Sequence, residues 1–108
     1  MTVNRGEVYL VGLPGQVKTR PAVILSADWL SQYALDVTVV PLTTVSRGNF
    51  FTRVELPAGD GGLKMSSWAK CDQVTTVPKD LLAAIAFGRV GPRKMAEIEE
   101  AVRLALGL

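Results

Sequence analysis

Residues 20–26, Arg-Pro-Ala-Val-Ile-Leu-Ser, and residues 39–44, Val-Val-Pro-Leu-Thr-Thr, are the two stretches that decide the fold. β-Branched and aliphatic residues dominate both, which is typical of buried strands. An arginine opens the first run and a Thr-Thr step closes the second, and core packing accounts for neither. Rigid scaffolds usually present their chemistry at strand ends and in the loops beyond them. The sequence therefore places a candidate functional site at Arg20 and the two threonines.

Short apolar runs on either side of these stretches predict further strands. Turn-rich segments such as Pro14-Gly15 and 57–62 separate the runs. The alternation of apolar and polar residues predicts strands at 7–13, 20–26, 37–43, 51–56, 67–77 and 85–90. A helical turn over 27–34, capped by Ser26 or Asp28, and a short helix from Pro78 to Leu82 are expected between them. Trp29, Tyr33 and Trp68 are interpreted as core or interface residues.

The clearest element is a helix at the end of the chain. Gly91-Pro92 starts it, and Gly107 ends it. Apolar residues repeat at helical spacing between these positions: Met95, Ile98, Val102 and Ala105. Together with the short strands, this helix predicts a mainly β fold, a small antiparallel barrel with a C-terminal helix.

Composition limits the kind of protein that this chain can be. Its 108 residues allow one domain, 1–108, and its formal net charge of +2 is too small to indicate nucleic-acid binding. It has no histidine and a single cysteine, Cys71, so a disulfide within the chain and a conventional zinc site are excluded. We expect no cofactor and no metal. No signal sequence and no run approaching ~18 apolar residues is present, so we expect a cytoplasmic protein without a membrane partner.

Four motifs together resemble a known family. They are Arg5-Gly6-Glu7-Val8-Tyr9, Arg20-Pro21, the Thr43-Thr44 step and Cys71-Asp72-Gln73-Val74. In this order and spacing the chain resembles the MazF/PemK/Kid toxins of type II toxin–antitoxin modules. The resemblance implies the SH3-like barrel of the CcdB/Kid/MazF-type plasmid maintenance toxins. It also implies a metal-independent, sequence-specific endoribonuclease (an mRNA interferase) that cuts single-stranded RNA and leaves 2′,3′-cyclic phosphate and 5′-hydroxyl ends.

The chemistry of RNA cleavage assigns roles to the matching residues. Attack by the 2′-hydroxyl needs a base, charge relief for the phosphorane and an acid for the departing 5′-oxygen. Arg20 matches the family's catalytic arginine, and a guanidinium binds phosphate oxygens in a fork. Thr43 matches the functional threonine, which would hydrogen-bond a phosphate oxygen.

The tetrapeptide at 70–73 supplies the remaining catalytic candidates. Lys70 and Asp72 alternate along the predicted strand 67–77, so both side chains are expected on one face. A plain salt bridge between them is the alternative interpretation. By analogy with an Arg-Cys-Asp-Gln stretch in some relatives, Asp72 is the candidate base and Lys70 the acid or phosphate-binding group. Loop 14–19 is shorter than in many relatives and lacks their site glutamate, so no cleavage sequence can be inferred.

Other polar residues near these positions are candidates for RNA binding, with solvated surface as the alternative. They are Lys18, Thr44, Arg47, Ser67 and Gln73. The resemblance further implies a homodimer inhibited by a MazE-like antitoxin, whose disordered acidic tail lies across the RNA site.

Two other functions compete with RNA cleavage. A gyrase-poisoning toxin of the CcdB type shares the barrel, but it needs a tryptophan near the C-terminus, and this chain has no aromatic residue after Phe87. A catalytically degenerate member that only binds a partner is the other alternative. The presence of both Arg20 and Thr43 argues against it.

Overall fold

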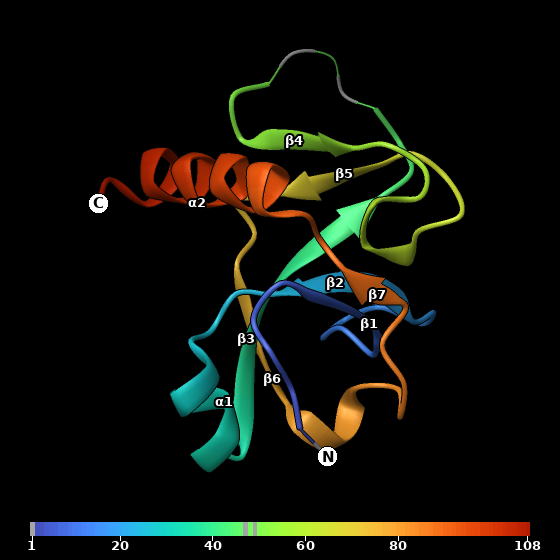
Figure 1. Ribbon diagram of the computed structural model, residues 1–108, viewed down its shortest axis with the longest axis vertical. Helices are drawn as coiled ribbons and strands as arrows, with labels where there is room; N and C mark the ends of the chain where they lie inside the picture. Colours follow the sequence, from blue (N-terminus) through green and yellow to red (C-terminus); the bar gives the residue numbers. More distant parts are fainter. Residues whose placement is uncertain (1, 47, 49) are drawn as a thin grey trace.

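Over the residues that the structure describes, one highly curved antiparallel sheet and two α-helices make up the fold (Figure 1). The computed structural model describes residues 2–46, 48 and 50–108. The strands are β1 (Glu7–Val11), β2 (Arg20–Ile24), β3 (Asp36–Thr43), β4 (Arg53–Leu56), β5 (Ser67–Lys70), β6 (Thr75–Pro78) and β7 (Gly88–Arg89). The α-helices are α1 (Asp28–Tyr33) and α2 (Pro92–Leu106), and two 3₁₀ turns are η1 (Asp60–Gly62) and η2 (Lys79–Leu81). This is the mainly β fold with a C-terminal helix that the sequence predicts.

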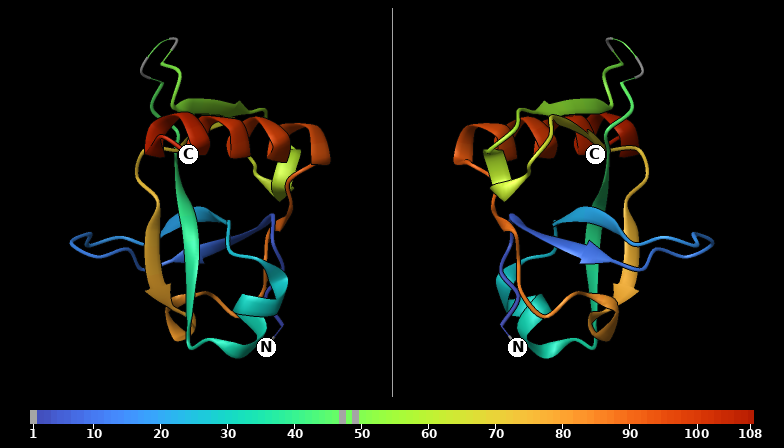
Figure 2. Two further views of the ribbon diagram at one scale, coloured as in Figure 1. Left: turned by 90° about the vertical axis from the view of Figure 1, so that its left-hand side faces the viewer. Right: turned by 90° about the vertical axis from the view of Figure 1, so that its right-hand side faces the viewer.

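Strand β3 organises the sheet because it belongs to both of its halves. The strand order is β4-β5-β3-β2-β1-β7, and β6 also pairs with β3. The first half of β3 pairs with β6, as in Val37 with Val77, whereas its end pairs with β5, as in Leu42 with Ala69. Its other edge pairs with β2, as in Ala22 with Pro41. The sheet therefore curls around β3 into a half-barrel (Figure 2).

The apolar core has two parts, one on each side of the curled sheet. The first lies between α2 and strands β4 and β5 and includes Ile98, Leu56 and Ala69, each fully buried. The second lies beneath β1, β2, β3 and β6 and includes Ile24 and Val39. Burying this apolar surface is the main stabilising contribution of both halves.

Helix α2 begins and ends where the sequence predicts. Gly91 is its N-cap and Pro92 its first residue, where the missing N–H of proline costs no hydrogen bond. Gly107 adopts a left-handed conformation with φ of 72° at the C-cap. Of the predicted stripe, Met95, Ile98 and Val102 are buried, whereas Ala105 is half-buried; Ala101 is buried as well.

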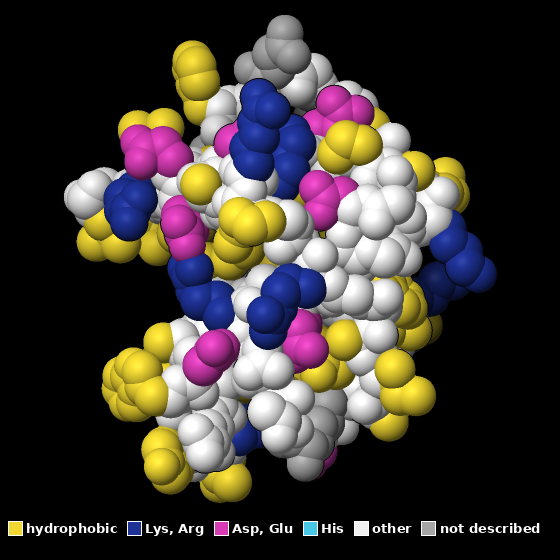
Figure 3. Space-filling view, in the orientation of Figure 1, with side chains coloured by type: hydrophobic (Ala, Val, Ile, Leu, Met, Phe, Trp, Pro, Cys, Tyr) yellow, Lys and Arg dark blue, Asp and Glu magenta, His cyan; other side chains and the backbone are white. Residues whose placement is uncertain are grey.

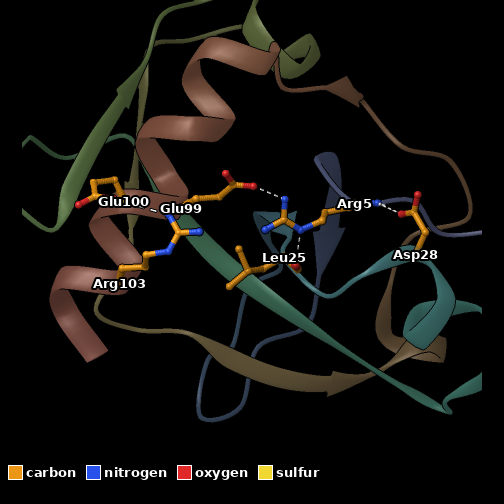
Figure 4. Close-up of polar contacts among 6 residues, drawn as sticks. All are labelled: Arg5, Leu25, Asp28, Glu99, Glu100 and Arg103. Atoms are coloured by element: carbon orange, nitrogen blue, oxygen red, sulfur yellow. Dashed lines mark hydrogen bonds and ion pairs between the residues drawn. The ribbon is translucent and has the colours of Figure 1, made fainter. Parts of the chain in front are cut away.

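Arg5 connects three elements that are far apart in the sequence (Figure 4). Its guanidinium donates a hydrogen bond of 2.8 Å to the backbone oxygen of Leu25 and forms an ion pair with Glu99 on α2. Its backbone N–H donates to the carboxylate of Asp28 on α1 at 2.6 Å. Arg5 of the first motif therefore holds the N-terminal segment, α1 and α2 together.

The predicted strand at 67–77 is wrong, because the structure has two strands there. Strand β5 ends at Lys70, and a turn follows in which the Gln73 N–H donates to the Lys70 oxygen at 3.0 Å. The chain then starts β6 at Thr75 on the other half of β3. Asp72 lies in this turn, so strand alternation does not place it on the same face as Lys70.

Several smaller predictions are also corrected. The strands predicted at 7–13, 20–26 and 51–56 are shorter, and that at 85–90 covers only 88–89. The N-cap of α1 is Ala27, without a side-chain hydrogen bond. Ser26 instead shares a buried hydrogen bond of 2.8 Å with Ser31, and Asp28 accepts from Arg5. Pro78 ends β6, and the helix expected after it is the 3₁₀ turn η2.

Helix α1 carries an exposed apolar surface. Trp29 and Tyr33 have exposed fractions of 68% and 80%, and Leu35 just beyond the helix has 86%. Hydrophobic side chains gather over this part of the molecule, whereas Lys and Arg alternate with Asp and Glu over the half that carries α2 (Figure 3). Trp29 and Tyr33 are therefore not core residues of the isolated chain.

Candidate active site

A cavity lies at the end of β3, between the start of β2 and the ends of β3 and β5. Its volume is about 210 Å³. It is lined by Gln16, Arg20, Pro21, Leu42, Thr43, Thr44, Val45, Ser67 and Lys70. Five of these residues are predicted site residues, so the fold brings together groups that lie up to 50 positions apart: Arg20, Thr43, Thr44, Ser67 and Lys70.

Strand register explains why these side chains meet. Ala22 pairs with Pro41, and this antiparallel register, continued two residues outward on each strand, places Arg20 at the level of Thr43. Lys70 is the last residue of β5 and lies directly opposite Arg53 of β4. Opposed residues in an antiparallel pair project from the same face. The two cations Arg53 and Lys70 are therefore neighbours beside the cavity.

Both threonines line the cavity, although strand alternation would allow only one. The reason is that β3 ends at Thr43, and Thr44 lies in the bend that follows. The Thr43 hydroxyl accepts a hydrogen bond of 3.1 Å from the Val45 N–H, which fixes its orientation. Thr43 is half-buried and Thr44 is exposed, so the Thr43 hydroxyl is held more firmly than that of Thr44.

The cavity is electropositive. Burial lowers the pKa of the Lys70 ammonium below its usual value of 10.5, and the nearby cations Arg53 and Arg20 lower that pKa further, partly opposed by Asp72. Arg20 is exposed, and its Nε donates a long hydrogen bond of 3.4 Å to the Gln16 side-chain oxygen. An anion such as a phosphate would relieve the repulsion among these cations.

Asp72 has a different partner from the one that the sequence suggests. Its carboxylate forms a hydrogen-bonded ion pair of 2.5 Å with Arg53, whose side chain is only 15% exposed. Of the described residues predicted to act on RNA, Asp72, Gln73 and Lys18 do not line the cavity wall. Arg47 lies outside the residues that the structure describes.

Sequence reasoning did not assign a role to Gln16 or Arg53. Gln16 reaches the cavity from the loop between β1 and β2, which projects from the body of the molecule (Figure 2). Among the described residues, the buried Nε of Arg53 has no hydrogen-bond acceptor. The alternation of Arg53 with Glu55 on a predicted strand was the available signal, but it did not show that Lys70 lies opposite.

Cys71 cannot serve as a nucleophile at neutral pH. The residue is fully buried, and burial raises the pKa of its thiol to about 12, with a smaller contribution from Asp72. A thiol is nucleophilic as the thiolate, so this group stays inert. Within the described part of the chain, no three His, Cys, Asp or Glu side chains form a potential metal site.

A half-barrel with one C-terminal helix and a cationic cavity at the strand ends places the chain in the class of small β-barrel proteins. The chain belongs to the family of PemK-like, MazF-like toxins of type II toxin–antitoxin systems, which matches residues 4–106. This confirms the family and the fold predicted from the sequence.

Individual relatives agree with this assignment. The chain is 30% identical to endoribonuclease MazF9 of Mycobacterium tuberculosis over 116 residues, which cover 98% of both chains. It is similar to a solved mycobacterial endoribonuclease in complex with its cognate antitoxin, with a TM-score of 0.86 and 32% identity over 98% of this chain and 96% of that one. MazF from Deinococcus radiodurans, at 19% identity, has the same fold with a TM-score of 0.85 over 100% of this chain and 99% of that one.

Proposed function

We propose that the protein is the toxin of a type II toxin–antitoxin module and a metal-independent, sequence-specific endoribonuclease acting on single-stranded RNA. The observation that carries the proposal is the convergence of Arg20, Thr43 and Lys70 on one cavity, in a chain whose family is that of MazF-like toxins. Single-stranded RNA is the expected substrate because its bases can be splayed out and recognised on their edges.

In the proposed reaction the 2′-oxygen attacks the adjacent phosphorus and the bond to the 5′-oxygen breaks. The guanidinium of Arg20 stabilises the negative charge on the phosphorane, and the Thr43 hydroxyl binds a non-bridging oxygen. Lys70 donates the proton to the departing 5′-oxygen, a role that its lowered pKa favours because the proton is more easily released. The products carry a 2′,3′-cyclic phosphate and a 5′-hydroxyl.

Asp72 is the proposed base that removes the 2′-hydroxyl proton. Because its carboxylate is paired with Arg53, RNA binding must first draw Arg53 toward a phosphate and free the carboxylate. The Nε of Arg53 is buried and has no acceptor among the described residues, so it becomes a further donor for that phosphate once the side chain moves outward. Arg53 therefore controls whether Asp72 can act as a base.

The remaining predicted contacts extend the RNA path on both sides of the cavity. Thr44 and Ser67 lie in the cavity wall, and we propose that they contact the nucleotides next to the cleaved bond. Lys18, Arg47 and Gln73 are proposed to bind RNA farther along the strand. Backbone contacts of this kind make binding depend on salt concentration.

The proposal extends to partners and location. We propose that the whole chain acts as one domain in a cytoplasmic homodimer, inhibited by a MazE-like antitoxin with a disordered acidic tail. A relative is known as an endoribonuclease in complex with its cognate antitoxin. Such a tail can bind over Arg20 and Lys70 and cover nearby apolar surface as it folds. Among the described residues, no helix is long and apolar enough to span a bilayer.

Cleavage of RNA in EDTA tests this function. Purified protein is incubated with several long, unrelated single-stranded RNAs, and the new ends are mapped and their phosphates identified. Cleavage at a recurrent sequence with cyclic phosphate ends is expected, and the antitoxin should inhibit it in competition with RNA. Absence of cleavage in all the RNAs would favour a non-enzymatic toxin or a degenerate, partner-binding member.

A further inference from the structure

A second cavity, of about 310 Å³, adjoins the proposed active site. It is lined by Pro21, Thr44, Gly62, Leu63, Lys64, Met65, Ser67 and Phe87, and its wall is mainly apolar. Pro21, Thr44 and Ser67 also line the cationic cavity, so the two hollows share a wall. A ligand with a phosphate in the first cavity would therefore reach the second with its next group.

The backbone around Phe87 is held rigidly. Its N–H donates to the Val8 oxygen of β1 at 2.8 Å. Gly62 packs against it so closely that a Cβ at this position would lie 2.1 Å from the Phe87 oxygen. Gly62 also has a positive φ of 76°, so both space and conformation require glycine there. The aromatic ring is consequently presented from a fixed main chain, with an exposed fraction of 47%.

The remaining walls of this second cavity are mainly apolar, with one cation at its edge. Leu63 is buried beneath the cavity, whereas Met65 is 64% exposed and can adapt to a flat ligand. The hydroxyl of Ser67 donates to the Met65 oxygen at 3.1 Å and thereby links this wall to the cationic cavity. Lys64 is exposed and adds a positive charge at the cavity.

We propose that this second cavity binds the nucleobase of a nucleotide next to the cleaved phosphate. This inference rests on the proposed ribonuclease function. The base stacks on Phe87 and contacts the Met65 thioether, and Phe87 and Met65 thereby help to determine which sequence is cut. An RNA strand suits both hollows because it alternates phosphates with flat bases, whose faces stack on apolar and aromatic surface. Stacking on aromatic side chains is a general means of binding single strands.

Substitution of Phe87 tests the assignment in the dimeric full-length protein. A pool of single-stranded RNA with random sequence is cleaved, and the base preference at each position is read from the mapped ends. Loss of one stacked base corresponds to about a 5- to 150-fold loss of binding. Phe87→Ala is therefore expected to raise KM by about that factor and to flatten the base preference at one position beside the cut, with kcat changed far less.

Matched variants separate stacking from folding. Phe87→Leu keeps an apolar side chain but cannot stack, so it should behave like Phe87→Ala. Phe87→Trp can still stack and should keep both KM and the base preference close to those of the unsubstituted protein. Phe51, which is 85% exposed and lies outside this cavity, provides the control Phe51→Ala, which should leave both unchanged. Met65→Ala should alter the same position in the recognised sequence, and thermal melting verifies that each variant is folded.

Three results would overturn the assignment. The first is an unchanged base preference and KM in folded Phe87→Ala and Phe87→Leu. The second is an equal effect of Phe51→Ala, and the third is weaker antitoxin binding with unchanged RNA binding, which would assign the cavity to an apolar side chain of the antitoxin. If the unsubstituted protein cuts no RNA, the proposed function fails instead. Binding of single-stranded oligonucleotides by fluorescence anisotropy then still shows whether Phe87 contacts a base.

Discussion

Replacing Arg20 by alanine removes the group on which the proposed reaction depends most. The side chain is exposed, and the hydrogen bond that its Nε donates to the Gln16 side-chain oxygen is long at 3.4 Å. Surface substitutions of this kind usually change the free energy of unfolding by no more than ~0.5 kcal/mol. The backbone pairing of Arg20 with Val11 does not depend on the side chain. We therefore expect Arg20→Ala to fold normally.

The expected effect on cleavage is large. Removing one preorganised donor to a developing oxyanion typically costs ~10²- to 10³-fold in rate. Arg20→Lys should recover only part of this loss, because an ammonium keeps the charge but cannot form the bidentate fork. Arg20 also lowers the pKa of Lys70, so its removal lets that pKa rise. If Lys70 is the acid, any residual activity of Arg20→Ala should persist to higher pH than the activity of the unsubstituted protein.

The assay measures kcat/KM for a fluorogenic single-stranded RNA in EDTA across a range of pH, with thermal melting to verify folding. Gln16→Ala is the matched control, since it removes the partner of Arg20 but no cation. It should reduce kcat/KM much less than Arg20→Ala does. Near-normal cleavage by a folded Arg20→Ala protein would refute the role of this arginine and the reasoning that places the phosphate in the cavity.

The proposed catalytic threonine, the proposed acid and base, and the apolar core can each be tested by substitution. Thr43→Ala should slow cleavage far more than Thr44→Ala, because the Thr43 hydroxyl is half-buried and held in place; equal rates in the two variants would contradict this. Asp72→Asn should lower activity and change the pH–rate profile, whereas Lys70→Ala should also weaken RNA binding measured by anisotropy; an unchanged profile for Asp72→Asn would remove it from the base role. Ile98→Ala, at a fully buried position on the inner face of α2, should lower the free energy of unfolding by ~2–5 kcal/mol in urea titrations, and a loss below ~1 kcal/mol would show that this core is loosely packed.

The correction at residues 67–77 shows where sequence patterns stop being informative. The turn at Cys71 and Asp72 contains neither glycine nor proline, so the chain gives no local signal that β5 ends at Lys70. The turn forms because β5 pairs with the end of β3 and β6 pairs with its first half, so the chain has to pass from one half of the sheet to the other between them. The pairing of Asp72 with Arg53 follows from this reversal, and it could not be foreseen from the tetrapeptide.

The sequence by itself determined the elements whose signals are local. The C-terminal helix was predictable because Pro92 and Gly107 act within a single turn and its apolar stripe repeats at a fixed spacing. The strands carrying Arg20 and Thr43 were predictable from their apolar runs, and the family from four ordered motifs.

Only the tertiary structure decided which of these residues meet. Strand register brings Arg20, Thr43 and Lys70 to one cavity, because β3 pairs with β2 along one edge and with β5 along the other, and this antiparallel pairing couples positions far apart in the chain. The apolar cavity beside it depends on the close approach of Gly62 to Phe87, two residues that no periodic pattern relates. Local conformation follows from neighbouring residues, whereas the arrangement of a site follows from long-range packing. Sequence motifs named five of the residues that line the cationic cavity, but which side chains meet there, and the apolar cavity beside it, follow only from the tertiary structure.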